Sequence, residues 1–173
     1  MQRHSGIGRI GLAAVAVALT ASACARPTPP PPPPAAAAAV TCGGPTSPPA
    51  GVIATVFART NSDRAASGLG ALQWNSQLSC LASSGNAQRA STGTFVHQDL
   101  TSAIRSSTYS SFRTLGENIL RGPTSMTGDQ MEDAWMNSPG HRANILSGAY
   151  RHLAIATTIG VDGRIYATTI FGG

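Results

Sequence analysis

The sequence contains no lysine, so all twelve of its basic residues are arginines. Three of them, Arg3, Arg9 and Arg26, lie in or just after an N-terminal leader, and the formal net charge of +5 therefore overstates the charge of the rest. From Cys42 onward nine arginines accompany seven acidic residues, which leaves a net charge of +2. These arginines form no basic run or stripe, so the sequence gives no reason to expect a nucleic-acid partner.

The chain also lacks a comfortable membrane span, because the apolar run from Ile10 to Thr20 is too short for one. This run follows Arg3 and Arg9 and precedes Ala21-Ser22-Ala23, a small-residue cleavage site. A positive start, a short apolar run and such a site are typical of an export signal. We therefore predict that residues 1–23 are a signal peptide and that the protein is exported.

Cys24 follows the cleavage site directly, which leaves two outcomes open. Lipoprotein processing would attach a lipid to Cys24 and hold the protein on the outer face of the membrane, in the cell envelope. Ordinary signal peptidase would instead release a secreted protein. The bacterial lipobox usually has Leu, Val or Ile three residues before the cysteine, where this chain has Ala21.

Cysteine is scarce, with only three residues in the chain, and an odd thiol is a liability in an oxidising exterior. If Cys24 carries a lipid, Cys42 and Cys80 remain as one pair. Their disulfide would join the segment before the first helix to the second helix and stabilise the fold by about 3–4 kcal/mol. The alternative is a free, buried Cys80 and a mobile Cys42.

Residues 24–50 are rich in proline and alanine and are predicted to be a tether. Six consecutive prolines, Pro29 to Pro34, impose polyproline II geometry, which makes a semi-rigid spacer. The alternative is a disordered tail with no spacing role. Residues 51–173 are expected to fold as one domain by their size, and they contain no internal repeat.

Local patterns predict the main elements of this domain. Apolar spacing predicts a helix over 52–67, and Asn61 and Arg64 lie on its core-facing stripe, where polar groups should be hydrogen-bonded. Asn75 is predicted to cap a second helix that runs to about residue 90. A Thr-x-x-Gln capping box begins a third helix at Thr127, and Asp162-Gly163 joins two alternating strands as a hairpin, 154–159 and 164–171.

Three polar positions are candidates for a site. His97 stands between the apolar residues Phe95 and Leu100, which we expect to anchor it. Glu117 lies within an apolar stretch, so it should be paired with a cation such as Arg64 or Arg142, protonated, or bound to a metal.

His141 is predicted to lie in the first turn of a helix that Ser138 caps and Pro139 begins. The helix dipole disfavours a protonated imidazole there, and a neutral imidazole can bind a metal or accept a proton. The alternative is a histidine at a helix corner that a backbone carbonyl satisfies.

Several motifs together resemble the bacterial branch of the CAP superfamily, named after cysteine-rich secretory proteins, antigen 5 and pathogenesis-related plant proteins. The resemblance covers essentially all of 52–173, so residues 51–173 are interpreted as the CAP domain. Its motifs are Phe95-Val96-His97, Gly116-Glu117-Asn118-Ile119, the stretch from Trp135 to Leu146 and the closing Tyr166 to Gly172, preceded in the family's order by Asn61, Arg64, Gly68, Leu72, Trp74 and Leu78.

The resemblance implies an α+β fold, a three-layer α-β-α sandwich around a three- or four-stranded antiparallel sheet that ends in a C-terminal β-hairpin. It also implies a shallow cleft lined by two histidines and two acids. Carried over by motif, these are His97, His141 and Glu117. The second acid usually follows the tryptophan by three residues, where this chain has Ser138, and Glu132 is an alternative acid three residues before it.

We weigh three functions for this cleft. The first, which we favour, is a non-catalytic extracellular module that binds a lipid, a cell-wall component or a protein partner, with the cleft as a metal-tuned binding or structural site. The second is a hydrolase in which His97 and His141 hold Zn²⁺ or another divalent cation and Glu117 acts as general base. The third is a purely structural polar cluster. In each case we expect a monomer.

Overall fold

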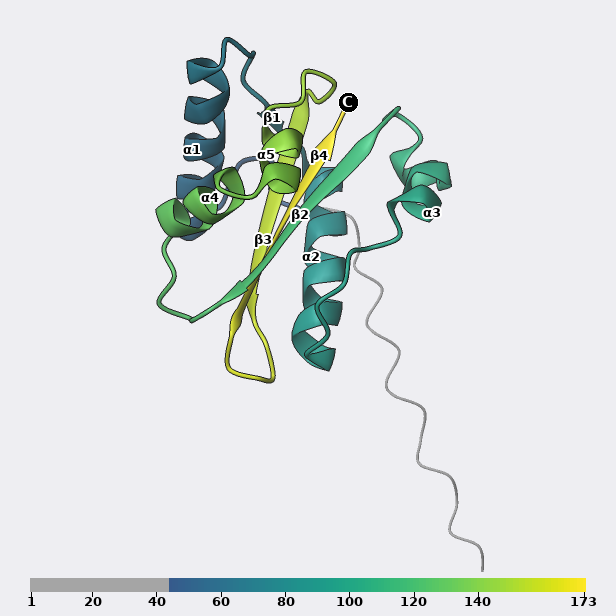
Figure 1. Ribbon diagram of the computed structural model, residues 1–173. Helices are drawn as coiled ribbons and strands as arrows, with labels where there is room; N and C mark the ends of the chain where they lie inside the picture. The colour runs from purple at the N-terminus through teal and green to yellow at the C-terminus, as the bar shows by residue number, and fades with distance from the viewer. Residues whose placement is uncertain (1–43) are drawn as a thin grey trace, which may run out of the picture. The chain divides into compact units, whose positions relative to one another are not determined.

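The computed structural model describes residues 44–173, which contain five α-helices, a short 3₁₀ helix and four strands (Figure 1). In chain order they are α1 (Val52–Ala66), β1 (Gln73–Trp74), α2 (Ser76–Thr92), α3 (Leu100–Arg105), η1 (Ser107–Tyr109), β2 (Leu115–Gly122), α4 (Gly128–Met136), α5 (Pro139–Ile145), β3 (His152–Ile159) and β4 (Ile165–Gly172).

The strands form one sheet in the order β1-β3-β4-β2. β4 pairs antiparallel with both β2 and β3, and all eight of its residues are buried. The two-residue β1 pairs parallel with β3, so the sheet is antiparallel except at this edge. The predicted hairpin is confirmed, and Gly163 takes a φ of +70° in its turn, which favours glycine.

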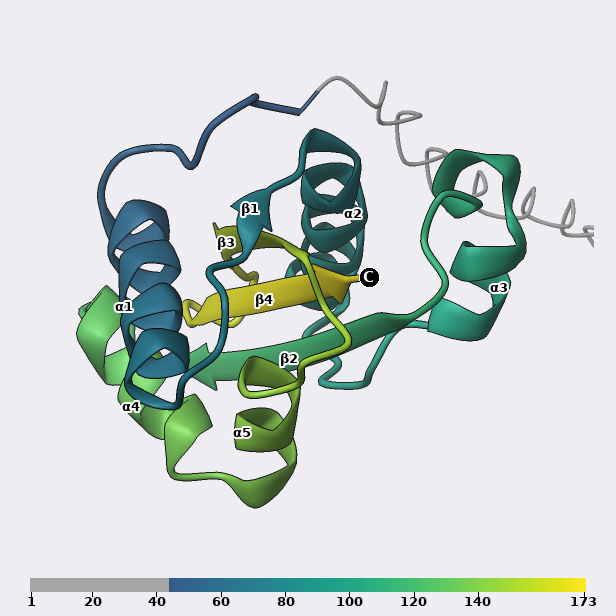
Figure 2. The same ribbon diagram turned by 90° about the horizontal axis from the view of Figure 1, so that it is seen from above.

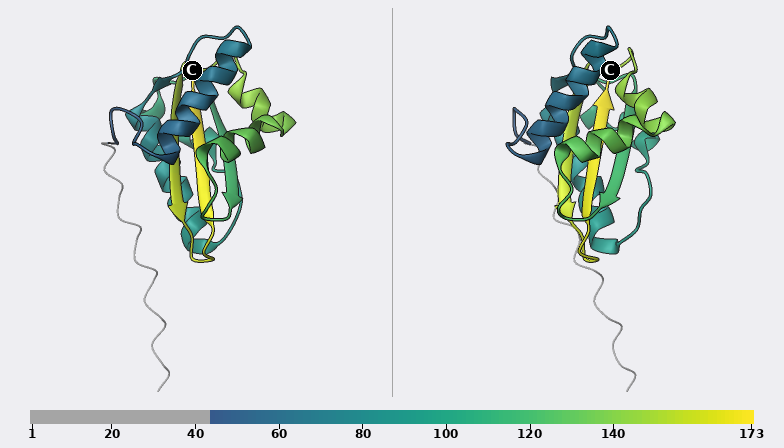
Figure 3. Two further views of the ribbon diagram at one scale, coloured as in Figure 1. Left: turned by 90° about the vertical axis from the view of Figure 1, so that its left-hand side faces the viewer. Right: turned by 60° about the vertical axis from the view of Figure 1, so that its left-hand side comes forward.

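The sheet lies between two helical layers, as the resemblance implied (Figures 2 and 3). α1, α4 and α5 cover one face, over a core that includes Trp135, Leu153 and Phe171. α2 covers the other face, over a core that includes Leu78, Ala154 and Ile170. Because successive strand residues point to opposite faces, β3 and β4 supply both cores at once.

The predicted helix signals are present in the structure. The Asn75 side chain accepts a hydrogen bond from the Leu78 N–H at 3.0 Å, and α2 ends at Gly93 in the left-handed conformation. Thr127 and Gln130 form both bonds of the capping box at the start of α4. These local side-chain bonds satisfy backbone groups that a helix terminus leaves unpaired.

The polar residues on the inner stripe of α1 are hydrogen-bonded, as predicted. Asn61 exchanges two bonds with the backbone of Leu72, at 2.7 and 3.1 Å. The Arg64 side chain is buried and donates to the carbonyls of Gly70, Ile145 and Ser147. Arg64 therefore ties the end of α1 to the end of α5.

Part of the expected tether contacts the folded domain. The Trp74 indole N–H donates to the Pro45 carbonyl at 2.7 Å, and Gly44 lies against Ser76 and Ser79 of α2. The predicted signal peptide, the lipidation site Cys24, the run of prolines and Cys42 lie outside the described residues. Within 44–173, no helix combines the length and apolarity that crossing a membrane requires.

Candidate functional site

Glu117 is the buried centre of the candidate site, with a side chain only 2% exposed. Its Oε1 accepts hydrogen bonds from Arg89 Nη2 and Gln98 Nε2, both at 2.8 Å. Its Oε2 accepts from His97 Nδ1 at 2.9 Å and from the Gln98 backbone N–H at 3.0 Å. The Arg89 guanidinium, the His97 imidazole and two N–H donors of Gln98 thus occupy both carboxylate oxygens.

The cation that pairs with Glu117 is Arg89, and the predicted partners Arg64 and Arg142 are wrong. Arg64 is committed to backbone carbonyls, and Arg142 is exposed on α5. Glu117 points toward the face of the sheet that α2 covers, where Arg89 is 3% exposed and also donates to Val96 O and Thr168 Oγ1. The burial of Arg89 could have been predicted from the sequence, because Arg89 lies at helical spacing from the apolar residues Leu78 and Ala82.

These contacts decide the ionisation of Glu117. Burial alone would raise the pKa of its carboxyl, but the bonds from Gln98, the charge of Arg89 and the bond from His97 outweigh burial, so the pKa is lowered. Glu117 is therefore ionised at neutral pH. A carboxylate with a lowered pKa is a weak proton acceptor, which limits its use as a general base.

His97 is hydrogen-bonded to Glu117, and of its two predicted apolar anchors only Leu100 packs against the core. Phe95 is 44% exposed, so its expected role as a buried anchor is wrong; its ring instead lies under the Arg121 guanidinium, 5.5 Å from the centroid. The His97 side chain is 59% exposed. With Nδ1 bonded to Glu117, its Nε2 is the ring nitrogen available to a ligand.

His141 lies in the first turn of α5, as predicted, and is half-buried. Its backbone carbonyl accepts a bond from Asn118 Nδ2 at 3.0 Å, and Asn144 Nδ2 donates to Asn118 Oδ1 at 2.9 Å. These two asparagines, which our sequence analysis did not single out, fix α5 against β2. Burial lowers the pKa of His141, and the nearby charge of His97 lowers it further, so the imidazole is neutral at pH 7.

The two histidines approach from opposite layers around the edge of the sheet. Glu117 and Asn118 are neighbours on β2 and therefore point to opposite faces. Glu117 holds His97 on the α2 side, whereas Asn118 holds His141 on the α5 side. Because β2 is an edge strand, the two imidazoles can face a common ligand beside it.

The other two candidate residues have different surroundings. Ser138 is the N-cap residue of α5 by position, but its side chain makes no capping hydrogen bond, contrary to our expectation. Glu132 is fully buried between α4 and α1, where it accepts a bond from Thr60 Oγ1 at 2.9 Å. Glu132 therefore does not replace the missing second acid of the cleft, because its side chain is committed to the α1 interface.

A divalent cation would find two imidazole donors here. No group of three or more His, Cys, Asp or Glu side chains within 44–173 is arranged to hold a metal ion. His97 nevertheless has the histidine–carboxylate bond that orients metal-binding imidazoles, and His141 is neutral. The residues thus fit an open site with two protein ligands and water in the remaining positions.

The three-layer sandwich agrees with what the sequence comparison finds. The model of the cysteine-rich secretory protein family, CAP, matches residues 57–171. The chain belongs to this family.

Individual relatives are longer than this chain. The protein YkwD of Bacillus subtilis is 35% identical over 117 residues, which cover 64% of this chain and 45% of YkwD. A cysteine-rich secretory protein from Staphylococcus aureus shares 26% identity with a TM-score of 0.53, over 69% of this chain and 37% of that one. An extracellular protein from Bacillus anthracis with an SCP domain shares 24% identity and a TM-score of 0.57, over 69% and 39%. The chain thus spans less than half the length of these proteins.

Proposed function

We propose that this protein is an exported, non-catalytic binding module of the cell envelope, whose His97 and His141 hold a divalent cation such as Zn²⁺. The observation that carries this proposal is the occupied carboxylate of Glu117. All its strong acceptor positions are used by Arg89, His97 and Gln98, so it orients an imidazole instead of performing proton transfer.

The proposed cation has open positions for a ligand. Two imidazoles leave at least two coordination positions of a tetrahedral zinc to water. A lipid phosphate, an anionic wall component or a protein carboxylate can replace such a water, and we propose these classes as the module's partners. Bound zinc would supply Lewis acidity, and this chain's own residues would hold and orient the imidazoles.

The same geometry disfavours a metal hydrolase. A catalytic zinc site normally has three protein ligands and a separate base. Glu117 cannot serve as a third ligand without giving up bonds to Arg89 or Gln98, and its lowered pKa makes it a poor base.

Export supports an envelope role. The N-terminal leader predicts export, and the similar protein from Bacillus anthracis is described as extracellular. We propose that Cys24 carries a lipid and that residues 24–50 hold the domain off the membrane. Mass spectrometry of the membrane fraction would detect the lipidated Cys24 peptide, and Cys24→Ser would move the protein to the medium.

The proposed cation site is tested by calorimetry and thermal unfolding of the metal-free protein with and without Zn²⁺. We expect micromolar binding of one zinc and a higher melting temperature, because a ligand that binds only the native state stabilises it. His97→Ala and His141→Ala should each abolish both effects.

His152→Gln is the matched control, since it also removes an imidazole, but one that lies edge-to-face against Phe112 and not beside His97 or His141. It should retain zinc binding. If His97→Ala and His141→Ala bind zinc like the parent and only melt lower, the histidines are structural and the proposal is wrong.

A further inference from the structure

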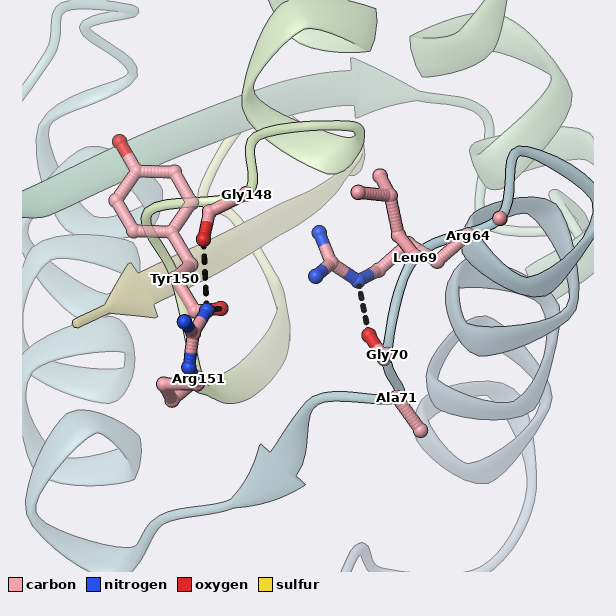
Figure 4. A pocket seen from close by; sticks show the side chains of 8 residues that line it. Arg64, Leu69, Gly70, Ala71, Gly148, Tyr150 and Arg151 are labelled. Carbon is pink, nitrogen blue, oxygen red and sulfur yellow. Dashed lines mark hydrogen bonds between the residues drawn. The ribbon is translucent and has the colours of Figure 1, made fainter.

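A concave site lies away from the histidines, between the loop that follows α1 and the segment that precedes β3 (Figure 4). Its volume is about 330 Å³, and its lining includes Arg64, Gly70, Gly148, Tyr150 and Arg151. This size is at the lower end for pockets that hold small molecules. None of the cleft residues His97, Glu117 or His141 contributes to it.

Arg64 is the buried floor of this pocket, only 2% exposed. Its Nε donates to Gly70 O at 3.0 Å, and its Nη1 donates to Ile145 O and Ser147 O at 2.7 and 2.8 Å. These bonds fix the plane of the guanidinium. Its Nη2 has no hydrogen-bond partner among residues 44–173, so one donor group of a rigidly held cation is left for a ligand.

Arg151 supplies a second cation at the mouth of the pocket. Its Nη1 donates to the carbonyls of Gly148 and Tyr150, at 2.6 and 3.0 Å, which holds the exposed side chain over the opening. Figure 4 shows the Arg64 guanidinium reaching from α1 toward this segment. Burial lowers the pKa of Arg64, and the positive charge of Arg151 lowers it further.

No acid offsets these two charges. The lining contains no Asp or Glu, and neither arginine forms an ion pair within the described part of the chain. The backbone around the pocket is open, because a Cβ added at Gly68, Gly70 or Gly148 would meet no atom within 4 Å. A bound anion would offset the two positive charges and accept a hydrogen bond from Arg64 Nη2.

We propose that Arg64 and Arg151 form an oxyanion-binding site for a phosphate or carboxylate group of a small molecule. Arginine suits both groups, because its planar donors match two oxygens at once. The volume exceeds that of a bare phosphate, since one water occupies about 30 Å³ of liquid. The pocket therefore has room for the atoms to which the anionic group is attached.

The test is titration of the metal-free, full-length mature protein with inorganic phosphate and, separately, with acetate, each against chloride at matched ionic strength. Binding is followed by calorimetry and by amide NMR shifts. We expect shifts centred on residues 68–71 and 148–151, from phosphate, from acetate or from both, and the two arms separate the phosphate source from the carboxylate source.

Arg151→Gln should weaken binding about tenfold, because one charge-assisted bond is lost. Arg164→Gln is the matched control: it removes the same charge from an exposed arginine at the hairpin turn and should leave the affinity unchanged. His97→Ala should also bind normally, which separates this site from the histidine cleft.

Equal losses in Arg151→Gln and Arg164→Gln would show unspecific attraction and overturn the proposal. So would the absence of any response to phosphate or acetate beyond that to chloride. Arg64→Lys is a second variant, which keeps the charge but not the fork of donors, and it should weaken binding in a protein whose circular dichroism is unchanged.

Discussion

Glu117 and Glu132 are both buried carboxyl groups, and their surroundings drive them to opposite states. Glu117 is ionised because Arg89, Gln98 and His97 all donate to it. Glu132 has one donor, Thr60, and its Oε1 has no partner within the described residues. Burial raises the pKa of Glu132 to about 7, against the smaller lowering effect of Thr60.

The first prediction concerns the pair of Arg89 and Glu117. Arg89→Met should lower the free energy of unfolding by about 3–5 kcal/mol at pH 7, because it leaves a buried charge without its cation. The pKa of Glu117 is lowered in the folded state, so its contribution is present above its ordinary pKa and is lost as the pH falls through the folded value. The loss should therefore shrink in acid.

Urea unfolding at pH 7 and pH 3 measures this difference. Arg113→Met, at an exposed position, is the control and should change stability little. A loss below about 1 kcal/mol at pH 7 would contradict the assignment of Arg89 as the partner of Glu117.

The second prediction concerns Glu132, whose pKa is raised in the folded state to about 7. A folded state that binds a proton more tightly than the unfolded chain loses stability as the pH rises. Between about pH 4.5 and pH 7 this loss should amount to about 3 kcal/mol. Glu132→Gln removes the charge and should be more stable than the parent at pH 8 but not at pH 5.

The histidines titrate in both proteins, so their contribution drops out of the difference in the free energy of unfolding between Glu132→Gln and the parent. Asp99→Asn, at the exposed N-cap of α3, should follow the pH profile of the parent between pH 5 and pH 8, because the bonds from Ser102 lower the pKa of Asp99 and keep it ionised there. Parallel stability profiles of Glu132→Gln and the parent would show that Glu132 does not titrate in this range.

At this scale the sequence predicted that His97, Glu117 and His141 come together but not which side chains pair with them. His97 and Glu117 meet, and His141 lies close enough for the charge of His97 to lower its pKa. Arg89 was not predicted as the partner of Glu117, because the two residues are 28 positions apart and meet only through the packing of α2 over β2. Ser138 was predicted to cap α5 because serine is common at the N-cap, but its side chain makes no capping hydrogen bond.

At the scale of elements, local signals succeeded where an element is stabilised by its own neighbours. The caps at Asn75 and Thr127 and the turn at Gly163 each depend on bonds or conformations within a few residues. β1 was not predicted as a strand, because its two residues are a strand solely through pairing with β3, about 80 positions later. Such a pairing leaves no periodic pattern in two residues.

The third prediction is the disulfide between Cys42 and Cys80, which joins the segment before α1 to α2. Gly44 lies so close to Ser79 that a Cβ there would be 3.1 Å from the Ser79 Cβ. Two residues of chain span at most about 7 Å, so the predicted bond requires only a two-residue segment to cross from Gly44 to Cys80. Thiol–disulfide exchange with an oxidised dithiol would form the bond, with both hydrogens passing to that dithiol.

Peptide mapping without reductant should show the linked Cys42 and Cys80 peptides. Cys42→Ser should lower the free energy of unfolding by about 3–4 kcal/mol, and reductant should have the same effect on the parent. Cys24→Ser is the control, which should keep the linked peptides. Alkylation of both Cys42 and Cys80 in the unreduced protein would contradict the pairing.

At the scale of the whole molecule, the site exists only because two helical layers meet around one strand. The layers themselves followed from the family resemblance, since helix and strand periods do not say which helix covers which face. His97 and His141 lie on opposite sides of the sheet. They come together because the neighbouring β2 residues Glu117 and Asn118 bond one histidine each. The site is therefore a property of the assembled sandwich and not of any single segment.

The position of β2 at the edge of the sheet has a further consequence, for self-association. Thr114 and Gly173 exchange both backbone bonds, so by the antiparallel alternation the carbonyls of Glu117 and Ile119 face outward. Asn144 Nδ2 and Trp135 Nε1 donate to these carbonyls, each at 3.2 Å. At the opposite edge, β1 pairs with only the first two residues of β3. The covered carbonyls of β2 give a second chain little backbone with which to pair, so copies of this domain are not expected to join their sheets through β2.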